Sequence, residues 1–275
     1  MVVDGVTCGC PASRHIQTTT RRAVAARDKY PFAIPPRTQV MLISSAMSGL
    51  ILAMVLFFNG GVLPDVAVAA ASSTIYTHGN ANLPEVALTF DDGPSPYTPQ
   101  VLAMLKHYNV HATFFLWGQH VQQYPTYAQQ ELAAGNALGN HTWSHPDLTT
   151  LSAAGVTTEL TEAQNVIRQA TGYTPTMFRP PYGSHNSNVL AVAGQVGLSS
   201  TIIWSYAPLD WEMPGTSVIA SRVLSNTSNG SIILLHDGGG DRSQTVAALP
   251  TIIQGLQARG LRLVTVPQLL ADIGK

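Results

Sequence analysis

Short apolar runs alternate with helical patterns from residue 85 to the end of this 275-residue chain. The apolar runs have the length of buried strands. They end at Phe90, Asn140 and Leu235, and near Leu116, Phe178, Ser205 and Val264. Helical patterns lie between them, over residues 98–107, 119–134, 152–171, 186–196, 216–226 and 245–260. Repeated strand–helix units predict a parallel sheet, and about seven units in this length predict that the sheet closes into an α/β barrel.

The residues suited to chemistry follow these predicted strands. At or just past a strand end lie Asp91, Asp92, His141, Arg179, Asp210 and His236. In α/β barrels the carboxyl ends of the strands meet at one face, and that face carries the active site. Polar residues in purely structural positions would not be expected to line up in this way. The pattern therefore predicts an enzyme site at this rim.

Asp91 and Asp92 stand side by side where an apolar run breaks into a Gly-Pro turn. Adjacent buried carboxylates repel, so one would be protonated unless a cation compensates. His141 and His145 are four residues apart, and Pro146 favours a brief turn there over a long helix. One Asp with two His leaves coordination positions open, as a catalytic divalent ion requires. The His pair alone would be weak evidence, and the paired acids strengthen it.

Three further patterns have both a functional and a structural interpretation. Consecutive prolines make the segment 178–183 rigid and non-helical, and Arg179 could orient a carboxylate there or lie on the surface. His236 ends an apolar run and could protonate a leaving group or be a core histidine. Trp204 and Trp211 could stack on sugar rings or fill the core.

Five ordered motifs, TFDDGP, HTxxH, RPPYG, DW and LLHD, resemble those of the polysaccharide deacetylases with a NodB homology domain, carbohydrate esterase family 4. The resemblance covers about residues 85–270. It implies a distorted (β/α)7-type barrel and a divalent metal, commonly zinc, with cobalt as a second candidate. Carried over by motif, the resemblance implies that Asp91 is the general base and that Arg179 orients it. It implies that His236 is the general acid and that Asp210 tunes the pKa of that acid. The implied metal ligands are Asp92, His141 and His145.

The resemblance also implies residues that contact the substrate. Tyr182 would supply a backbone N–H to an oxyanion, Trp211 and Leu234 would line the acetyl pocket, and Pro181 would add a substrate contact. Ala207 departs from the family, whose members often carry Asp three residues before the DW motif. This departure bears on substrate contacts and on pKa tuning. Loops near residues 120–125 and 238–243 are expected to form sugar subsites.

Three functions stay open at this point. The first is removal of N-acetyl groups from N-acetylglucosamine units of peptidoglycan or a chitin-like extracellular polymer, with Asp91 as base and His236 as acid in the attack of a metal-bound water. The second uses the same residues on O-acetyl esters of xylan or another hemicellulose. The third is a cell-surface glycan-binding protein without catalysis, which the retained ligands, base and acid argue against.

The N-terminal part of the chain predicts export. Residues 1–39 form a basic, disordered leader, and residues 40–58 are nineteen residues without a charge, enough to span a bilayer. Residues 59–82 are predicted to be a linker to the deacetylase domain at 83–275. The positive-inside rule places the N-terminus in the cytoplasm and the domain on the extracellular face of the membrane. A small-x-small pattern at Ala69 would instead allow cleavage and secretion.

Charge argues against a nucleic-acid partner. From residue 41 onward the chain has eight basic and thirteen acidic residues, and the whole chain has a net charge of -1. The expected partners are an acetylated polysaccharide and the membrane, and no protein partner is evident. Cys8 and Cys10 lie on the predicted cytoplasmic side, so no disulfide is expected in the exported domain.

Overall fold

The computed structural model describes residues 72–273. These residues belong to one unit of the chain, Ala67–Lys275. The predicted leader, the span at 40–58 and the cleavage site near Ala69 lie outside the described residues and stay predictions. Within residues 72–273, no helix has both the length and the apolar character needed to cross a bilayer.

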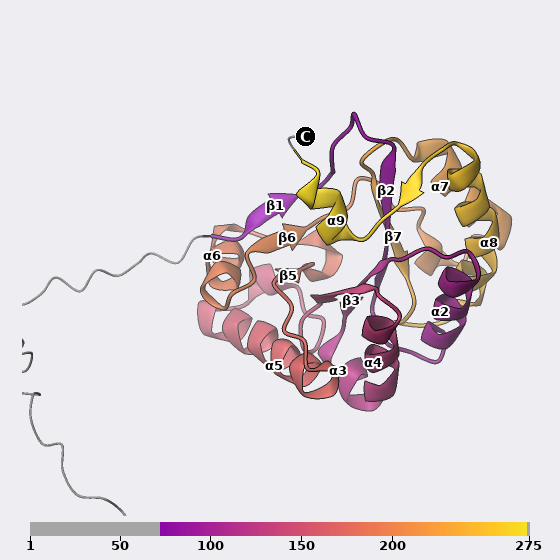
Figure 1. Ribbon diagram of the computed structural model, residues 1–275. Coiled ribbons are helices and arrows are strands. Elements are labelled where there is room, and N and C mark those ends of the chain that lie inside the picture. Colours follow the sequence, from indigo (N-terminus) through magenta and orange to yellow (C-terminus); the bar gives the residue numbers. More distant parts are fainter. Residues whose placement is uncertain (1–71, 274–275) are drawn as a thin grey trace, which may run out of the picture. The chain divides into compact units, whose positions relative to one another are not determined.

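One sheet organises the described residues (Figure 1). Its strands are β1 (Thr74–Tyr76), β2 (Glu85–Asp91), β3 (Thr113–Leu116), β4 (Ala137–Asn140), β5 (Met177–Phe178), β6 (Ser200–Ile202), β7 (Ile232–His236) and β8 (Arg262–Leu263). The order is β1-β6-β5-β4-β3-β2-β7, and β8 pairs with β2. Every one of these pairs is parallel, which confirms the arrangement predicted from the strand–helix alternation.

The sheet curls until β7 meets the chain that follows β6. The Ser205 N–H donates to the carbonyl of Ile232 (2.9 Å), and the Leu234 N–H donates to the carbonyl of Tyr206 (3.0 Å). These two bonds stand in place of a continuous row of hydrogen bonds between strands. Strand β6 therefore ends at Ile202, short of Ser205, near which the sequence predicts its end. The described strands form an incompletely closed barrel, consistent with the distorted barrel that the sequence predicts.

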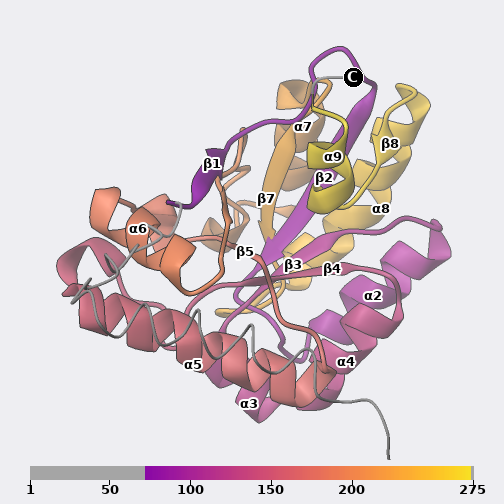
Figure 2. The ribbon, with the colours of Figure 1, turned by 60° about the vertical axis from the view of Figure 1, so that its left-hand side comes forward.

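Helices surround the curled sheet (Figures 1 and 2). They are α2 (Thr98–His107), α3 (Gly118–Gln123), α4 (Pro125–Ala133), α5 (Ala153–Thr171), α6 (Ser187–Gln195), α7 (Thr216–Asn226), α8 (Ser243–Ala258) and α9 (Val266–Ala271), with short 3₁₀ turns η1 (Leu148–Thr150), η2 (Pro181–Gly183) and η3 (Asp210–Glu212). The sequence predicts one helix over 119–134, but the structure has two. Pro125 has no backbone N–H to donate, so it cannot continue α3 and instead opens α4.

Strand β2 shows how the core and the site share one element. All seven of its residues are buried. Val86, Leu88 and Phe90 belong to the main core cluster, which packs the sheet against helices. Side chains alternate along a strand, so Thr89 and Asp91 point to the opposite side, into the barrel. The same strand therefore fixes the fold with one face and delivers a carboxylate with the other.

Strand β1 lies within residues 59–82, the stretch that the sequence suggests is a linker. It pairs with β6 in parallel, from Thr74 against Ser200 to Tyr76 against Ile202. None of its residues is fully buried. The sequence does not predict β1, because an exposed edge strand of three residues has no apolar run. Its pairing with β6 shows that the structured part of the chain begins before residue 83.

Candidate active site

Asp91 is the last residue of β2, and a buried arginine holds its carboxylate. Nη1 of Arg179 donates to Oδ1 of Asp91 (2.7 Å) and to the hydroxyl of Thr89 (2.8 Å), while Nε donates to the carbonyl of Ile202 (3.1 Å). The guanidinium carbon lies 4.1 Å from the centre of the Phe115 ring, and Arg179 has no exposed surface. A charge-assisted bond inside the barrel therefore fixes the orientation of Asp91.

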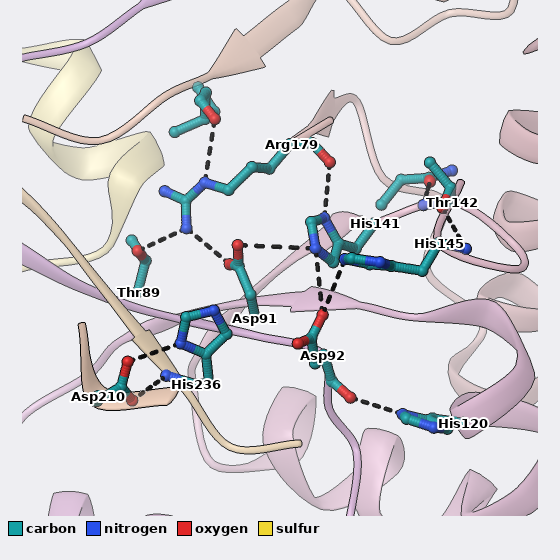
Figure 3. A network of polar contacts seen from close by, with 12 residues as sticks. Thr89, Asp91, Asp92, His120, His141, Thr142, His145, Arg179, Asp210 and His236 are labelled. Carbon is teal, nitrogen blue, oxygen red and sulfur yellow. Dashed lines mark hydrogen bonds and ion pairs between the residues drawn. The ribbon is translucent and has the colours of Figure 1, made fainter. Parts of the chain in front are cut away.

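Asp92, His141 and His145 bring three potential ligand atoms within 4.8 Å of one another (Figure 3). The Nε2 atoms of His141 and His145 lie 3.4 Å and 3.3 Å from Oδ1 of Asp92. This Oδ1 is buried and makes no hydrogen bond with any described residue. Nδ1 of His141 donates to the carbonyl of Arg179 (2.7 Å), so the lone pair of that ring sits on Nε2.

This donor set fits a divalent cation. A carboxylate and two imidazoles are the ligand types that zinc and cobalt accept, and a buried carboxylate oxygen without a donor needs positive charge nearby. Burial raises the pKa of Asp92, but the neighbouring imidazoles, His141 first and then His236 and His145, outweigh burial and hold the pKa well below its usual range. The carboxylate is therefore ionised and available as a ligand.

The backbone takes an unusual conformation around this cluster. The φ angles of Asp92, Thr142, His145 and Tyr182 are 67°, 68°, 61° and 60°. Residues other than glycine adopt this left-handed region at a cost, and such residues concentrate at functional sites. Side chains support the turn between the imidazoles, because Oδ1 of Asn140 accepts from the Thr142 N–H (2.8 Å) and the Thr142 hydroxyl accepts from the His145 N–H (3.0 Å).

Glycines let the loops after β2 and β7 approach at backbone distance. A methyl group on Gly238 would overlap the carbonyl of Asp92, and one on Gly93 would overlap the carboxylate of Asp237. Only glycine fits at either position unless the neighbouring chain moves. The backbone of the proposed ligand Asp92 is therefore held in place by the loop that follows β7.

His236 ends β7 and is paired with a fully buried acid. Its Nδ1 donates to Oδ1 of Asp210 (2.8 Å), and its backbone N–H donates to Oδ2 of the same carboxylate (2.9 Å). The hydroxyl of Thr245 also donates to Oδ2 (2.9 Å). Burial lowers the pKa of His236, but the hydrogen bond and the charge of Asp210 outweigh burial, so its pKa is raised. The ring therefore favours the protonated form that a general acid requires.

A cavity of about 420 Å³ opens over these side chains, and its lining comprises Asp91, Asp92, His141, His145, Tyr182, Trp204, Trp211, Leu234, His236, Gly239 and Arg242. The structure thus brings most of the predicted site residues together. Arg179 and Asp210 lie behind this lining and contact it through hydrogen bonds to Asp91 and His236. Pro181 is buried and is not among the lining residues, and its contact with substrate stays a prediction. Ala207 is outside the lining as well.

Sequence reasoning gave no role to three residues of the site. Thr89 stands two positions before Asp91 on one strand, so the side-chain period of a strand could have placed it beside that acid. Trp117 directly follows a predicted strand end, and its ring packs 4.9 Å from that of His145. Arg242 lines the cavity and donates to carbonyls of the preceding glycines. No local pattern distinguishes this arginine.

Similarity to known proteins identifies the family. The sequence profile of the family described as polysaccharide deacetylase matches residues 78–201. A peptidoglycan-N-acetylglucosamine deacetylase of Bacillus cereus is 43% identical over 188 residues, which are 67% of this chain and 87% of that relative. The chain belongs to the polysaccharide deacetylase family. This confirms the family that the five motifs predict, and it makes the protein a deacetylase enzyme.

Two further similarities extend this result. The deacetylase is 42% identical over 197 residues to a chitooligosaccharide deacetylase of Bradyrhizobium sp., covering 67% of this chain and 90% of the other. It also resembles the crystal structure of the peptidoglycan N-acetylglucosamine deacetylase Bc1960, with a TM-score of 0.70 and 35% identity over 72% of this chain and 94% of that one. Sequence and fold therefore agree on polysaccharide deacetylation as the activity.

Proposed function

We propose that this deacetylase removes N-acetyl groups from N-acetylglucosamine units of an extracellular polysaccharide of the peptidoglycan or chitin type. The observation that carries the proposal is the placement of two proton-transfer groups around one cluster of ligand atoms. Asp91 is oriented by Arg179 (2.7 Å), His236 is oriented by Asp210 (2.8 Å), and both line the same cavity as Asp92. The peptidoglycan and chitooligosaccharide relatives support an amide of N-acetylglucosamine as substrate.

The residues proposed to hold a divalent ion, zinc or cobalt, are Asp92, His141 and His145. Such an ion supplies Lewis-acid activation of water and of the acetyl carbonyl when it is bound. The His141 ring is fixed for this role by its Nδ1 bond to the carbonyl of Arg179 (2.7 Å). Arg179 thus orients the proposed base through its side chain and a proposed ligand through its backbone.

The proton transfers follow from the geometry of the side chains. Asp91 accepts a proton from the attacking water, because Arg179 fixes the orientation of its carboxylate (2.7 Å) at the cavity. The water oxygen forms the new bond to the acetyl carbon, and the C–N bond then breaks. The amine is a poor leaving group, so it needs a proton, which His236 donates from Nε2 while Nδ1 stays bonded to Asp210. The products are acetate and the free amino sugar.

The remaining walls suit a sugar that carries an acetyl group. Trp211 and Leu234 line the cavity beside His236, and the Trp211 ring lies 5.4 Å from the His236 ring. Tyr182 is 68% exposed at the rim, and its ring packs 4.9 Å from that of His145. We assign Trp211 and Leu234 to the acetyl pocket and the Tyr182 backbone N–H to the oxyanion.

Acetate release tests this proposal. The full chain, stripped with a chelator and reloaded with zinc or cobalt, is incubated in parallel with N-acetylglucosamine oligomers, peptidoglycan and acetylated xylan. We expect acetate from the amide substrates, and we expect at least about a hundredfold loss in Asp91→Asn, because that variant lacks the proposed base. Acetate from xylan alone would assign the enzyme to O-acetyl esters. No acetate from any substrate, with metal bound, would favour a glycan-binding protein without catalysis.

We further propose that the enzyme acts outside the cell, anchored by residues 40–58 with its N-terminus in the cytoplasm, or secreted after cleavage near Ala69. The uncharged stretch and the polymeric substrate class support this location. Protease added to intact cells should remove the deacetylase domain or find it already in the medium. Complete protection of a cell-associated domain would contradict the proposal.

A further inference from the structure

We infer that His120 is a positioning residue for the proposed metal ligand Asp92, whose backbone carbonyl it holds. The inference rests on the proposed function, because it takes Asp92 as a ligand of a divalent ion. Nδ1 of His120 lies 2.6 Å from the carbonyl oxygen of Asp92 (Figure 3). A carbonyl can only accept a hydrogen bond, so Nδ1 carries the hydrogen and donates it. His120 is not among the residues that line the reaction cavity, so its contribution to the site passes through Asp92.

The bond supports a backbone conformation that is costly for Asp92. The φ angle of Asp92 is 67°, in the left-handed region, and such a conformation persists only where surrounding contacts fix it. The backbone decides where the Asp92 side chain points. It thereby sets the place of Oδ1, which lies 3.4 Å and 3.3 Å from the Nε2 atoms of His141 and His145. A contact that fixes the backbone of Asp92 therefore also fixes the geometry of the proposed ligands.

Three successive carbonyls at the end of β2 are each held by a donor. The carbonyls before and after that of Asp92 accept from the backbone N–H groups of Asp237 (3.1 Å) and Trp117 (2.9 Å). The carbonyl of Asp92 itself accepts from the His120 ring. The two outer bonds come from the backbone and persist when side chains change, whereas the middle bond depends on one side chain. His120 is therefore the support of this turn that a single substitution can remove.

Helix α3, which carries His120, is also bonded to the turn that holds the two imidazole ligands. The first N–H groups of a helix have no partner within it. In α3 the first two donate to the carbonyls of Thr142 (2.9 Å) and Trp143 (3.1 Å), which lie between His141 and His145. This helix therefore holds the imidazole ligands through its backbone and the carboxylate ligand through His120.

The His120 ring is itself fixed in place. Its centre lies 4.3 Å from that of the Trp117 ring, and the two rings are inclined by 33°. His120 is half-buried, so the donated bond is partly shielded from water. A donor on a ring that is already packed loses little freedom when it binds the carbonyl. The bond is therefore an effective restraint on Asp92.

Two substitutions separate the donated bond from the bulk of the ring. His120→Asn keeps a donor at the same place along the side chain, because the amide nitrogen of Asn and Nδ1 of His are both attached to Cγ. His120→Leu keeps bulk but has no donor. Two controls accompany them. Gln119→Leu changes an exposed neighbour on α3 without removing its backbone N–H, and His107→Leu removes an exposed imidazole outside the site.

The readout is the zinc affinity of the chelator-stripped full chain, measured by competition with a chelating dye. We expect His120→Leu to bind zinc about ten- to a hundredfold more weakly than the wild type, the range typical of a lost contact behind a metal ligand. His120→Asn should recover most of that affinity, and both controls should match the wild type. In the cobalt-loaded proteins the visible absorption spectrum reports the geometry of the ligands. This spectrum should change in His120→Leu and be restored in His120→Asn.

Unchanged zinc affinity in His120→Leu, or an equal loss in His120→Asn and His120→Leu, would overturn the positioning role. Metal binding also separates this role from the proposed reaction. A wild type that binds zinc but releases no acetate would overturn only the reaction, and weaker zinc binding by His120→Leu would still support the positioning of Asp92. Acetate release by the wild type, with unchanged zinc affinity in His120→Leu, would overturn only the positioning role.

Discussion

Arg179 is the residue on which the largest number of site contacts converge. Its side chain holds Asp91 and Thr89, and its carbonyl holds the His141 ring. Arg179→Met should lower the free energy of unfolding by about 3–5 kcal/mol, because it leaves Asp91 as a buried carboxylate without its partner. Urea denaturation at neutral pH measures this loss.

A double-mutant cycle distinguishes the ion pair from packing. The variant with both Arg179→Met and Asp91→Asn should lose less free energy of unfolding than the sum of the two single losses, because the unpaired charge is gone. Strict additivity would mean that the bond between these side chains contributes little, and the role given to Arg179 would be wrong.

His236 should set the alkaline limit of activity. Its pKa is raised above the ordinary 6.5 because Asp210 outweighs burial. The protonated acid is lost as pH rises through this pKa, so kcat/KM falls on the alkaline side. Asp210→Asn removes the largest raising influence and leaves burial with the smaller influences of Asp92 and Asp91, so the alkaline limb should move to lower pH. The measurement is kcat/KM against pH, with Glu212→Gln, an exposed acid on the same turn η3, as control.

An alkaline limb that stays in place in Asp210→Asn would assign the titration to another group. A shift of the same size in the control would mean that general surface charge, and not the bond to His236, controls the profile.

The residues that gather at the cavity could be predicted from sequence, together with the supporting residues Arg179 and Asp210, but the other supporting residues could not. Asp91, His141 and His236 each follow a readable apolar run, so the parallel arrangement alone brings them to one rim. Thr245 and Arg242 lie in or beside α8, and they reach the site only because the loop after β7 folds back. Pro181, which is predicted to contact substrate, is buried in the turn η2 and does not line the cavity.

At the scale of elements, α4 carries an acid into the protein interior. Glu131 has no exposed surface, and neither carboxylate oxygen makes a hydrogen bond with a described residue. Burial, with a smaller contribution from the charge of Asp237, raises the pKa of Glu131 well above its ordinary 4.5. Below pH 4.5 both the folded and the unfolded chain carry the protonated acid, so the raised pKa then has no effect on stability.

Above that pH the unfolded chain ionises while the folded chain stays neutral, so the free energy of unfolding falls as pH rises. Glu131→Gln removes this dependence. The variant should gain stability relative to wild type between about pH 4 and about pH 8, as measured by urea denaturation across that range. Glu162→Gln, on the exposed face of α5, is the control and should change little. A constant difference between wild type and Glu131→Gln would show that Glu131 does not titrate differently on folding.

Elements with strong periodicity are the ones that sequence predicts well. The bounds of α2 and α7 agree with the predicted 98–107 and 216–226. Strand β1 is an exposed edge without an apolar pattern, and the sequence does not predict it. Strand β5 ends at Phe178 as predicted, but it has only two residues. Tertiary pairing to β6 stabilises both of them, and that pairing is not visible in a local window.

At the scale of the whole described domain, the curled parallel sheet explains why the candidate site residues lie close together. Strands β2 to β7 end at the same rim, whereas β8 pairs only with the start of β2, and loops from both halves of the chain line the cavity at this rim. The sequence alone leads to that convergence. It does not lead to the close approach of Gly238 to Asp92, because this approach depends on how loops distant in sequence fit together.

The most direct test is a zinc titration of the chelator-stripped full chain, with bound metal and acetate release from N-acetylglucosamine oligomers measured on the same samples. If Asp92, His141 and His145 form the catalytic metal centre, activity should be absent at the start and rise in proportion to bound zinc up to about one ion per chain. His145→Ala should require much more zinc for the same activity. Full activity in the stripped protein, or zinc binding that His145→Ala leaves unchanged, would contradict the account.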